Sequence, residues 1–191
     1  NNSETRQIKH DQKNFILGAL AELKQHHYEE LELQLNKQLE SLNSFSFPST
    51  ELPIVHAIID FKSKSAKESS AKIECSTRIL AKSTINDIDL AILLGNLLDN
   101  AIEATAVLPD HSKKEIRVFV EVTEPQMIVS VTNPVIKDIN VNHLKTTKND
   151  SQNHGYGLLA VRRIGDKYNG TLLLDCQNNT FGASAVLNQP E

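Results

Sequence analysis

The sequence is poor in the residues that mark membrane, nucleic-acid-binding or disulfide-rich proteins. It has no Trp, one Met and two Cys among 191 residues. No apolar run approaches the roughly 18 residues of a membrane-spanning helix, because the longest candidate, residues 90–98, is interrupted by Gly95 and Asn96. The formal net charge is −4 and the basic residues form no long run. We therefore expect no direct binding to nucleic acid.

The cysteines and histidines suggest neither a disulfide framework nor a metal centre of their own. Cys75 and Cys176 form no C-x-x-C pair, so we expect reduced thiols in a cytosolic chain. Four histidines show no metal-ligand spacing together: His56, His111, His143 and His154. The chain begins at Asn1 rather than at Met. We expect it to be a fragment of a longer protein.

Residues 1–43 differ in composition from the rest of the chain. They lack Pro, contain only Gly18, and are rich in Leu, Lys, Glu and Gln. Apolar residues recur there at helical spacing, in one set before and one set after a turn expected at residues 26–28: Ile8, Phe15, Ile16, Leu20 and Leu23, then Leu31, Leu35, Leu39 and Leu42. Each stripe is narrow, so the predicted helical hairpin needs a partner. A four-helix bundle in a homodimer is the simplest solution.

Residues 44–52 are predicted to be a linker, because two prolines and several serines lie in and around them. Residues 53–191 then change to a mixed pattern, with cap-like residues Ser49, Thr50 and Glu51 just before the first helix. The predicted elements are helices over 54–65, 87–107 and 157–168, and strands over 72–77, 115–122, 127–131, 171–176 and 183–187. The fold class is therefore α+β, with helices on one face of a mixed sheet.

The segment LLGNLLDNAIEA carries the strongest chemical signal. Asn96, Asn100 and Glu103 fall on one face of the helix predicted over 87–107. The flanking residues are mostly Leu, Ile and Ala, so the helix is expected to be largely buried, and polar amides beside a core need partners. From these residues alone, a binding site and a structural polar seam remain equally open.

Two further segments gain meaning from their position. The segment H-G-Y-G-L, with Gly155, Gly157 and Leu158, follows a polar stretch and opens a helix, where backbone N–H groups can hold an anion. In R-Q-I-K-H-D-Q-K-N, His10 and Asn14 share a helical face and Asp11 adjoins it. A carboxylate next to a histidine can orient the imidazole, although most lone surface histidines have no function.

These segments, in this order and at these separations, resemble those of sensor histidine kinases. R-x-x-x-H-D-x-x-N resembles the phosphoacceptor box. N-L-L-D-N-A and H-G-Y-G-L resemble the asparagine and glycine boxes of the GHKL ATP-binding fold, which gyrase and heat-shock chaperones share. N-G-T-L-L-L-D and T-F-G-A-S-A-V-L resemble its closing strands. Two of these segments, the phosphoacceptor box and D-N-A-I-E-A within the asparagine box, are similar to those of the AgrC and ComD type of peptide-pheromone receptor kinases. The resemblance covers residues 6–188.

The resemblance implies a fold and two ligands, ATP and Mg²⁺. The expected architecture is a phosphoacceptor hairpin over 1–43, followed by a GHKL-type α/β sandwich with a mixed sheet over 53–191. Asn96, Gly155, Gly157 and Leu158 would contact nucleotide, and Asn100 would bind Mg²⁺. Lys148, in the polar segment before the glycine box, would neutralise negative charge on the ATP phosphates.

One departure from the common kinase pattern concerns adenine recognition. The usual Asp-x-Gly-x-Gly box is replaced by Val131-Thr132-Asn133-Pro134-Val135. Asn133 can still accept a hydrogen bond from the adenine amine through its side-chain oxygen, but without charge. The resemblance therefore implies weaker nucleotide binding.

The expected chemistry is transfer of the γ-phosphoryl group to His10. ATP-hydrolysing relatives have a Glu four residues before the magnesium-binding Asn, and the matching residue here is Asn96, which cannot take a proton. Asp11 would orient the His10 ring and take its proton. Asn14 would position water when the partner response regulator is dephosphorylated.

The resemblance also implies a biological setting. The expected function is autophosphorylation followed by transfer to a response-regulator aspartate in peptide-pheromone (quorum-sensing) signalling. The expected location is the cytoplasmic face of the cell membrane, reached only through a sensor region outside this chain. Two alternatives stay open: a degenerate ATP-binding scaffold or response-regulator phosphatase without kinase activity, and a GHKL ATPase whose hairpin only oligomerises.

Overall fold

The computed structural model describes residues 2–41, 51–109, 112–138, 140–141 and 155–190. The chain divides into two compact units, Asn1–Ser46 and Phe47–Glu191. Within the described ranges, no helix combines the length and apolar character that crossing a bilayer requires. The same ranges hold no cluster of three or more His, Cys, Asp or Glu side chains arranged to bind a metal ion.

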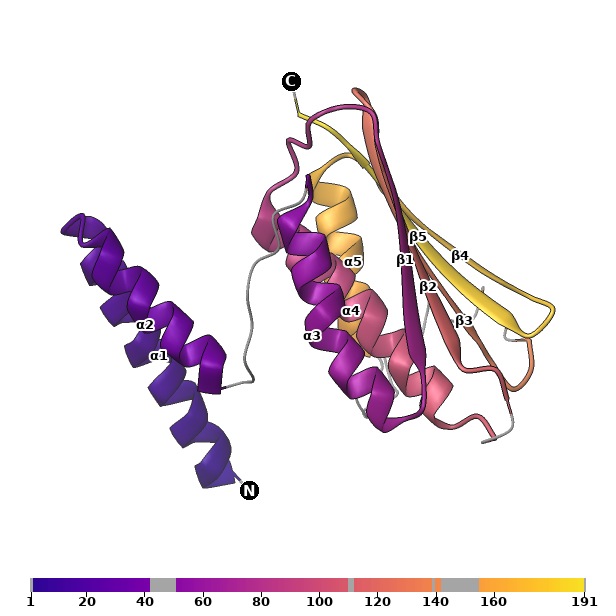
Figure 1. Ribbon diagram of the computed structural model, residues 1–191, viewed down its shortest axis with the longest axis horizontal. Coiled ribbons are helices and arrows are strands. Elements are labelled where there is room, and N and C mark those ends of the chain that lie inside the picture. Colours follow the sequence, from indigo (N-terminus) through magenta and orange to yellow (C-terminus); the bar gives the residue numbers. More distant parts are fainter. Residues whose placement is uncertain (1, 42–50, 110–111, 139, 142–154, 191) are drawn as a thin grey trace. The chain divides into compact units, whose positions relative to one another are not determined.

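The first unit is a helical hairpin, as the apolar spacing predicts. Helix α1 (Asn2–Lys24) is followed by α2 (Tyr28–Ser41), which folds back along it (Figure 1). The turn contains His26 with φ of 61°, and the backbone N–H of His27 donates to the carbonyl of Glu22 at 3.0 Å. Several apolar side chains of the hairpin are exposed by 41–68%: Ile16, Leu17, Leu20, Leu23, Leu33 and Leu35.

In its described residues, the second unit is a sheet of five strands covered on one face by three helices (Figure 1). The strands are β1 (Lys72–Ile79), β2 (Glu115–Val122), β3 (Gln126–Pro134), β4 (Thr171–Gln177) and β5 (Thr180–Asn188), and the helices are α3 (Pro53–Glu68), α4 (Asp87–Ala106) and α5 (Gly155–Lys167). The strand order is β1-β2-β3-β5-β4. Among these strands, β1 and β2 pair in parallel and the other three pairs are antiparallel. The sheet is therefore mixed, and the predicted α+β class is confirmed.

The core lies between the sheet and the helices. Strands β2 and β3 alternate buried and less buried residues, and their inward side chains meet α4 from one side. The buried strand residues pair in register, with Val118 opposite Val131 and Val131 opposite Ala183. The middle helix α4 is buried along most of its length, and Leu93, Leu94 and Leu98 have no exposed surface. This burial keeps α4 fixed under the sheet.

The start of α3 corrects one expectation. Glu51 and the two residues before it were predicted to cap this helix, but Leu52 occupies the cap position and makes no side-chain cap hydrogen bond. Pro53 begins the helix, where its missing N–H costs nothing and its fixed φ suits the first turn. Leu52 is buried in the core, so packing determines where α3 starts. Ser49 and Thr50 lie outside the described residues.

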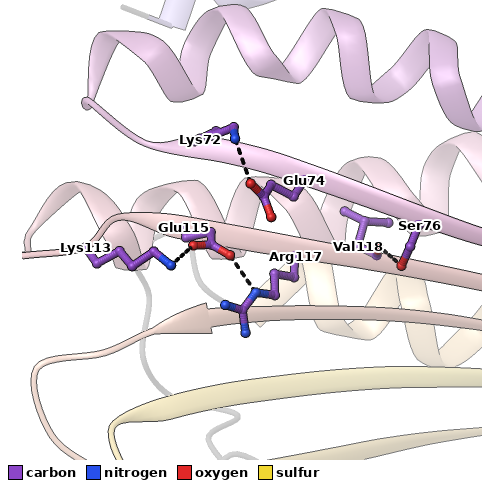
Figure 2. Close-up of polar contacts among 7 residues, drawn as sticks. All are labelled: Lys72, Glu74, Ser76, Lys113, Glu115, Arg117 and Val118. Carbon is purple, nitrogen blue, oxygen red and sulfur yellow. Dashed lines mark hydrogen bonds and ion pairs between the residues drawn. The ribbon is translucent and has the colours of Figure 1, made fainter.

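The other face of the sheet carries paired charges at its β1 edge (Figure 2). Arg117 donates to Glu115 at 2.6 Å, and Lys113 pairs with the same carboxylate. These two cations lower the pKa of Glu115 to about 2. Along β1, Lys72 donates to Glu74 at 2.6 Å. Charges on an edge strand oppose pairing with another chain.

Candidate nucleotide site

Helix α4 holds the two asparagines that the sequence singles out. The helix begins at its cap residue, Asn86, whose side-chain oxygen accepts hydrogen bonds from the backbone N–H groups of Ile88 and Asp89. The amide nitrogen of Asn96 donates to the carbonyl of Ile92 at 2.7 Å. The side-chain oxygen of Asn96 is therefore the atom that can act as an acceptor toward other elements. The side chain of Asn100 makes no hydrogen bond within the part of the chain that the structure describes.

The first turn of α5 lies against these two amides. A Cβ atom added to Gly157 would lie 3.1 Å from Oδ1 of Asn96 and 3.4 Å from Oδ1 of Asn100. Glycine is therefore the residue that lets α5 approach so closely. The structure thus brings Gly157 to Asn96 and Asn100, which lie 61 and 57 residues earlier in the sequence.

This arrangement suits a phosphate chain with a hard cation. Amide oxygens are ligands that Mg²⁺ accepts beside phosphate and water oxygens. The first turn of a helix presents free backbone N–H groups and positive potential to an anion. A Cβ atom at Gly157 would crowd the Asn96 oxygen by a few tenths of an ångström, so a side chain there would narrow the space between these two sets of groups. The residues present therefore fit Mg²⁺ with a nucleotide phosphate, and neither amide can act as a general base.

Asn133 lies on the helix-covered face of the sheet, near the end of β3. It is 3% exposed and follows the same alternation as buried Val129 and Val131. Its amide nitrogen donates to the carbonyl of Pro134 at 3.0 Å. That bond leaves the side-chain oxygen as the acceptor, which is the group expected to receive a donor such as the adenine amine.

The structure describes only some of the other residues predicted to form the nucleotide site. Gly155 begins α5. The side chain of Leu158 is partly buried against the core cluster. Lys148 lies outside the described residues, as does His154 before the glycine pair.

His10 lies on α1, in the other unit, with its two sequence-predicted companions beside it. Nδ1 of His10 is 3.2 Å from the amide nitrogen of Asn14 and 3.5 Å from a carboxylate oxygen of Asp11. The side chains of His10 and Asp11 are 67% and 63% exposed. Because both neighbours approach Nδ1, Nε2 is the ring nitrogen left to other partners.

Two groups that position α4 were not identified from the sequence. Lys62 of α3 donates to Asp99, next to Asn100, at 2.6 Å. Lys167 and Tyr168, at the end of α5, both bond to Asp89 in the first turn of α4. For the contacts of Asp89, the sequence offers one signal: Asn86 and Asp89 have the spacing of a helix capping pair. No local sequence pattern identifies the residues of α3 and α5 that bond to Asp99 and Asp89.

Known proteins share the fold of the second unit. Residues 85–188 match the GHKL domain family. No curated protein sequence is significantly similar to the chain. Among solved structures, three nucleotide-free forms of the catalytic domain of the histidine kinase ThkA superpose with TM-scores of 0.56, 0.56 and 0.55. Their sequence identity to the chain is 18%, 17% and 17%, over 71% of this chain and 90–92% of theirs. At this identity the likeness concerns the fold.

Proposed function

Because the chain belongs to the GHKL domain family, we propose that it is an ATP-dependent protein-histidine kinase that phosphorylates its own His10. The observation that carries the proposal is the meeting of Asn96, Asn100 and Gly157 at the junction of α4 and α5. A solved structure with a similar fold, which covers 71% of this chain, is the catalytic domain of a histidine kinase. The hairpin adds an exposed histidine with an adjacent carboxylate.

The nucleotide would bind along the face of α4 that carries Asn96 and Asn100, with its adenine toward the end of β3 at Asn133. The first turn of α5 and the second N–H of the Asn96 amide would donate to the phosphates, and the oxygen of Asn133 would accept a hydrogen bond from the adenine amine. Asn100 would hold Mg²⁺, which when bound neutralises charge on the phosphates. Gly155 and Leu158 would shape the same turn, and Lys148 would add positive charge. These assignments agree with the free amide of Asn100 and the orientation of Asn133 among the described residues.

The acceptor chemistry follows from the surroundings of the imidazole. Nε2 of neutral His10 attacks the γ-phosphorus; the new N–P bond forms as the bond from phosphorus to the β,γ-bridging oxygen breaks, and ADP leaves. Because Nε2 attacks, Nδ1 carries the ring proton, and Asn14 then faces Nδ1 with its side-chain oxygen as acceptor rather than with its amide nitrogen. That proton passes to Asp11, whose carboxylate lies 3.5 Å from Nδ1. Asn96 in place of a carboxylate removes the base that would activate water. The site therefore favours transfer to histidine over hydrolysis.

The exposed leucines of the hairpin support a homodimer. In the single chain, Leu20 and Leu23 are each 47% exposed on α1 and Leu35 is 41% exposed on α2. A second hairpin would cover them in a four-helix bundle.

We further propose that His10 passes its phosphoryl group to an aspartate of a response regulator in peptide-pheromone signalling. Asn14 would position water when that aspartyl phosphate is hydrolysed.

Incubation with γ-labelled Mg-ATP tests the proposal. We expect acid-labile, base-stable label on the wild-type chain and none on His10→Gln. Asn14→Ala is the matched variant on the same helical face, and it should keep the label. Binding of Mg-ATP without label would favour the scaffold or phosphatase alternative. Release of free phosphate without label would favour an ATPase.

A further inference from the structure

The hydroxyl of Tyr168 joins the end of α5 to the start of α4. Tyr168 is 7% exposed. Its hydroxyl donates to Asp89 at 2.6 Å and accepts a hydrogen bond from the backbone N–H of Asn86 at 3.1 Å. Lys167 donates to the same oxygen of Asp89, also at 2.6 Å. The phenol is thus held by two different groups of α4.

Those two groups are the ends of a capping pair. Asn86 is the cap residue of α4, and Asp89 stands three residues later. In an ordinary capping box the acidic side chain reaches back to the backbone N–H of the cap residue. Here the hydroxyl of Tyr168 is inserted between them, so the chain of bonds runs from the Asn86 N–H through the phenol to the Asp89 carboxylate. The cap of α4 is complete only when α5 is in place.

The main chain fixes Tyr168 from the other side. Its carbonyl accepts a hydrogen bond from the backbone N–H of Asn188, at the end of β5, at 3.1 Å. A Cβ atom on Gly170, two residues later, would lie 2.0 Å from the carbonyl of Val186. This end of α5 is therefore fixed to both α4 and the sheet.

The other end of α5 is the nucleotide site. Gly157 is eleven residues before Tyr168, which corresponds to about 16 Å along a helix. Between the two ends, Val161 and Ile164 are buried in the core. A helix held in this way transmits a slide or rotation at its last turn to its first turn. The clearance at Gly157 is small, since an added Cβ would lie 3.1 Å from Asn96, so a small displacement changes the site.

We propose that Tyr168 is a positioning residue for the nucleotide site. Its hydroxyl, inserted between the backbone of Asn86 and the carboxylate of Asp89, sets the register of α5 against α4 and so holds Gly157 against Asn96 and Asn100. The proposal rests on the proposed function, because it assigns to this register the binding of Mg-ATP. Tyr168 touches neither the nucleotide nor the reacting atoms.

The test uses Tyr168→Phe in the full chain, at a temperature where circular dichroism shows it folded. Two readouts are compared with wild type: the side-chain amide resonances of Asn96 and Asn100, and the Kd for Mg-ATP. Both resonances should shift although the substitution lies at the far end of α5. The Kd should rise about tenfold, the lower part of the range for groups that orient a ligand-binding shell.

Two other variants separate positioning from general loss of a hydroxyl. Ser184→Ala removes a hydroxyl that bonds Ser130 at 2.8 Å on the uncovered face of the sheet, and should leave both readouts unchanged. Asp89→Asn keeps an acceptor for the phenol, and should change both readouts less than Tyr168→Phe does. Unmoved Asn96 and Asn100 resonances in Tyr168→Phe, or an unchanged Kd, would overturn the proposal.

The two readouts also separate this proposal from the function on which it rests. If the wild-type chain does not bind Mg-ATP, the proposed function fails and the role of Tyr168 in nucleotide binding fails with it. In that case shifted resonances would still show that Tyr168 sets the register of α5. If wild type binds Mg-ATP and Tyr168→Phe binds it equally well, only the positioning role is wrong.

Discussion

At the scale of single residues, the amides of Asn96 and Asn100 determine which chemistry the proposed site can perform. Both present neutral oxygens that can bind a cation or accept a hydrogen bond, and neither can remove a proton from water. Their position on α4 follows from the burial of the leucines around them, since Leu97 and Leu98 are 2% and 0% exposed. The amides are therefore held on a helix that cannot easily rotate.

Asn100→Ala should impair autophosphorylation strongly. Loss of one preorganised group that stabilises charge typically costs about 10²–10³ in rate, and Asn100 is the proposed Mg²⁺ ligand. The measurement is the initial rate of labelling of His10 at saturating Mg-ATP. Thr105 is buried on the same helix, and among the described residues its hydroxyl donates to the carbonyl of Ala101 in its own turn. Thr105→Val is therefore a suitable control. A rate for Asn100→Ala equal to that of wild type would contradict the metal role.

Gly157→Ala tests the close approach of α5 to α4. The new methyl group would lie 3.1 Å from Asn96 Oδ1, and crowding of this kind typically costs about 1–3 kcal/mol. The Kd for Mg-ATP should rise about tenfold or more. Gly95→Ala is the matched control, because a Cβ there meets nothing within 4 Å. It should leave binding unchanged and stabilise α4 by about 0.5–1 kcal/mol. Equal Kd values for Gly157→Ala and wild type would show that the phosphates bind elsewhere.

At the scale of elements, the covered sheet explains what the sequence could predict. Strands β2 and β3 alternate because one face is buried, so the period of two identified both of them. The cap residue Asn86 predicted the start of α4 correctly. The parallel pairing of β1 with β2 had no sequence signal, because it depends on contacts between residues more than 40 positions apart.

The site was predictable to the same extent as the elements. The spacing of Asn96 and Asn100 placed them on one face, and the glycine pair marked the start of α5. Their meeting follows from the packing of α5 on α4, and was implied only by the family resemblance. The contact of Tyr168 with Asp89 joins residues 79 positions apart. Local propensity and periodicity carry no information about such a pair.

The ion pairs at the charged edge of the sheet should make the free energy of unfolding depend on pH in the acid range. The two cations beside Glu115 lower its pKa in the folded chain from 4.5 to about 2. The stabilisation is therefore fully present above about pH 4.5 and is lost as the pH falls toward 2. Glu115→Gln should lower the free energy of unfolding at pH 7, and its difference from wild type should narrow over that acid range.

Carboxyl resonances give the direct check on Glu115. With Lys113→Ala and Arg117→Ala combined, the pKa of Glu115 should return toward 4.5, because both neighbouring cations are gone. Titration of the Glu115 side-chain carboxyl carbon measures it. A midpoint near 4.5 in the wild-type chain would show that the ion pairs in Figure 2 do not hold in solution.

At the scale of the whole molecule, the proposed kinase needs the hairpin to pair with a second copy. Leu20→Glu combined with Leu23→Glu places charges on the exposed apolar face of α1, where burial in a bundle would be strongly unfavourable. Light scattering should report a dimer for wild type and a monomer for this variant. Leu33→Glu is the control, because Leu33 is 68% exposed and lies off the face of Leu31 and Leu35. A monomeric wild-type chain would contradict the proposed bundle.

The central claim joins the two units: the site on α4 and α5 supplies the phosphoryl group, and His10 on α1 receives it. The most direct measurement is to incubate the 191-residue chain with γ-labelled Mg-ATP and to locate the label by peptide mapping at neutral or alkaline pH. We expect one labelled peptide, containing His10, whose label is lost in acid and kept in base. Label on another residue, label that persists in His10→Gln, or release of phosphate with no labelled protein would contradict the account.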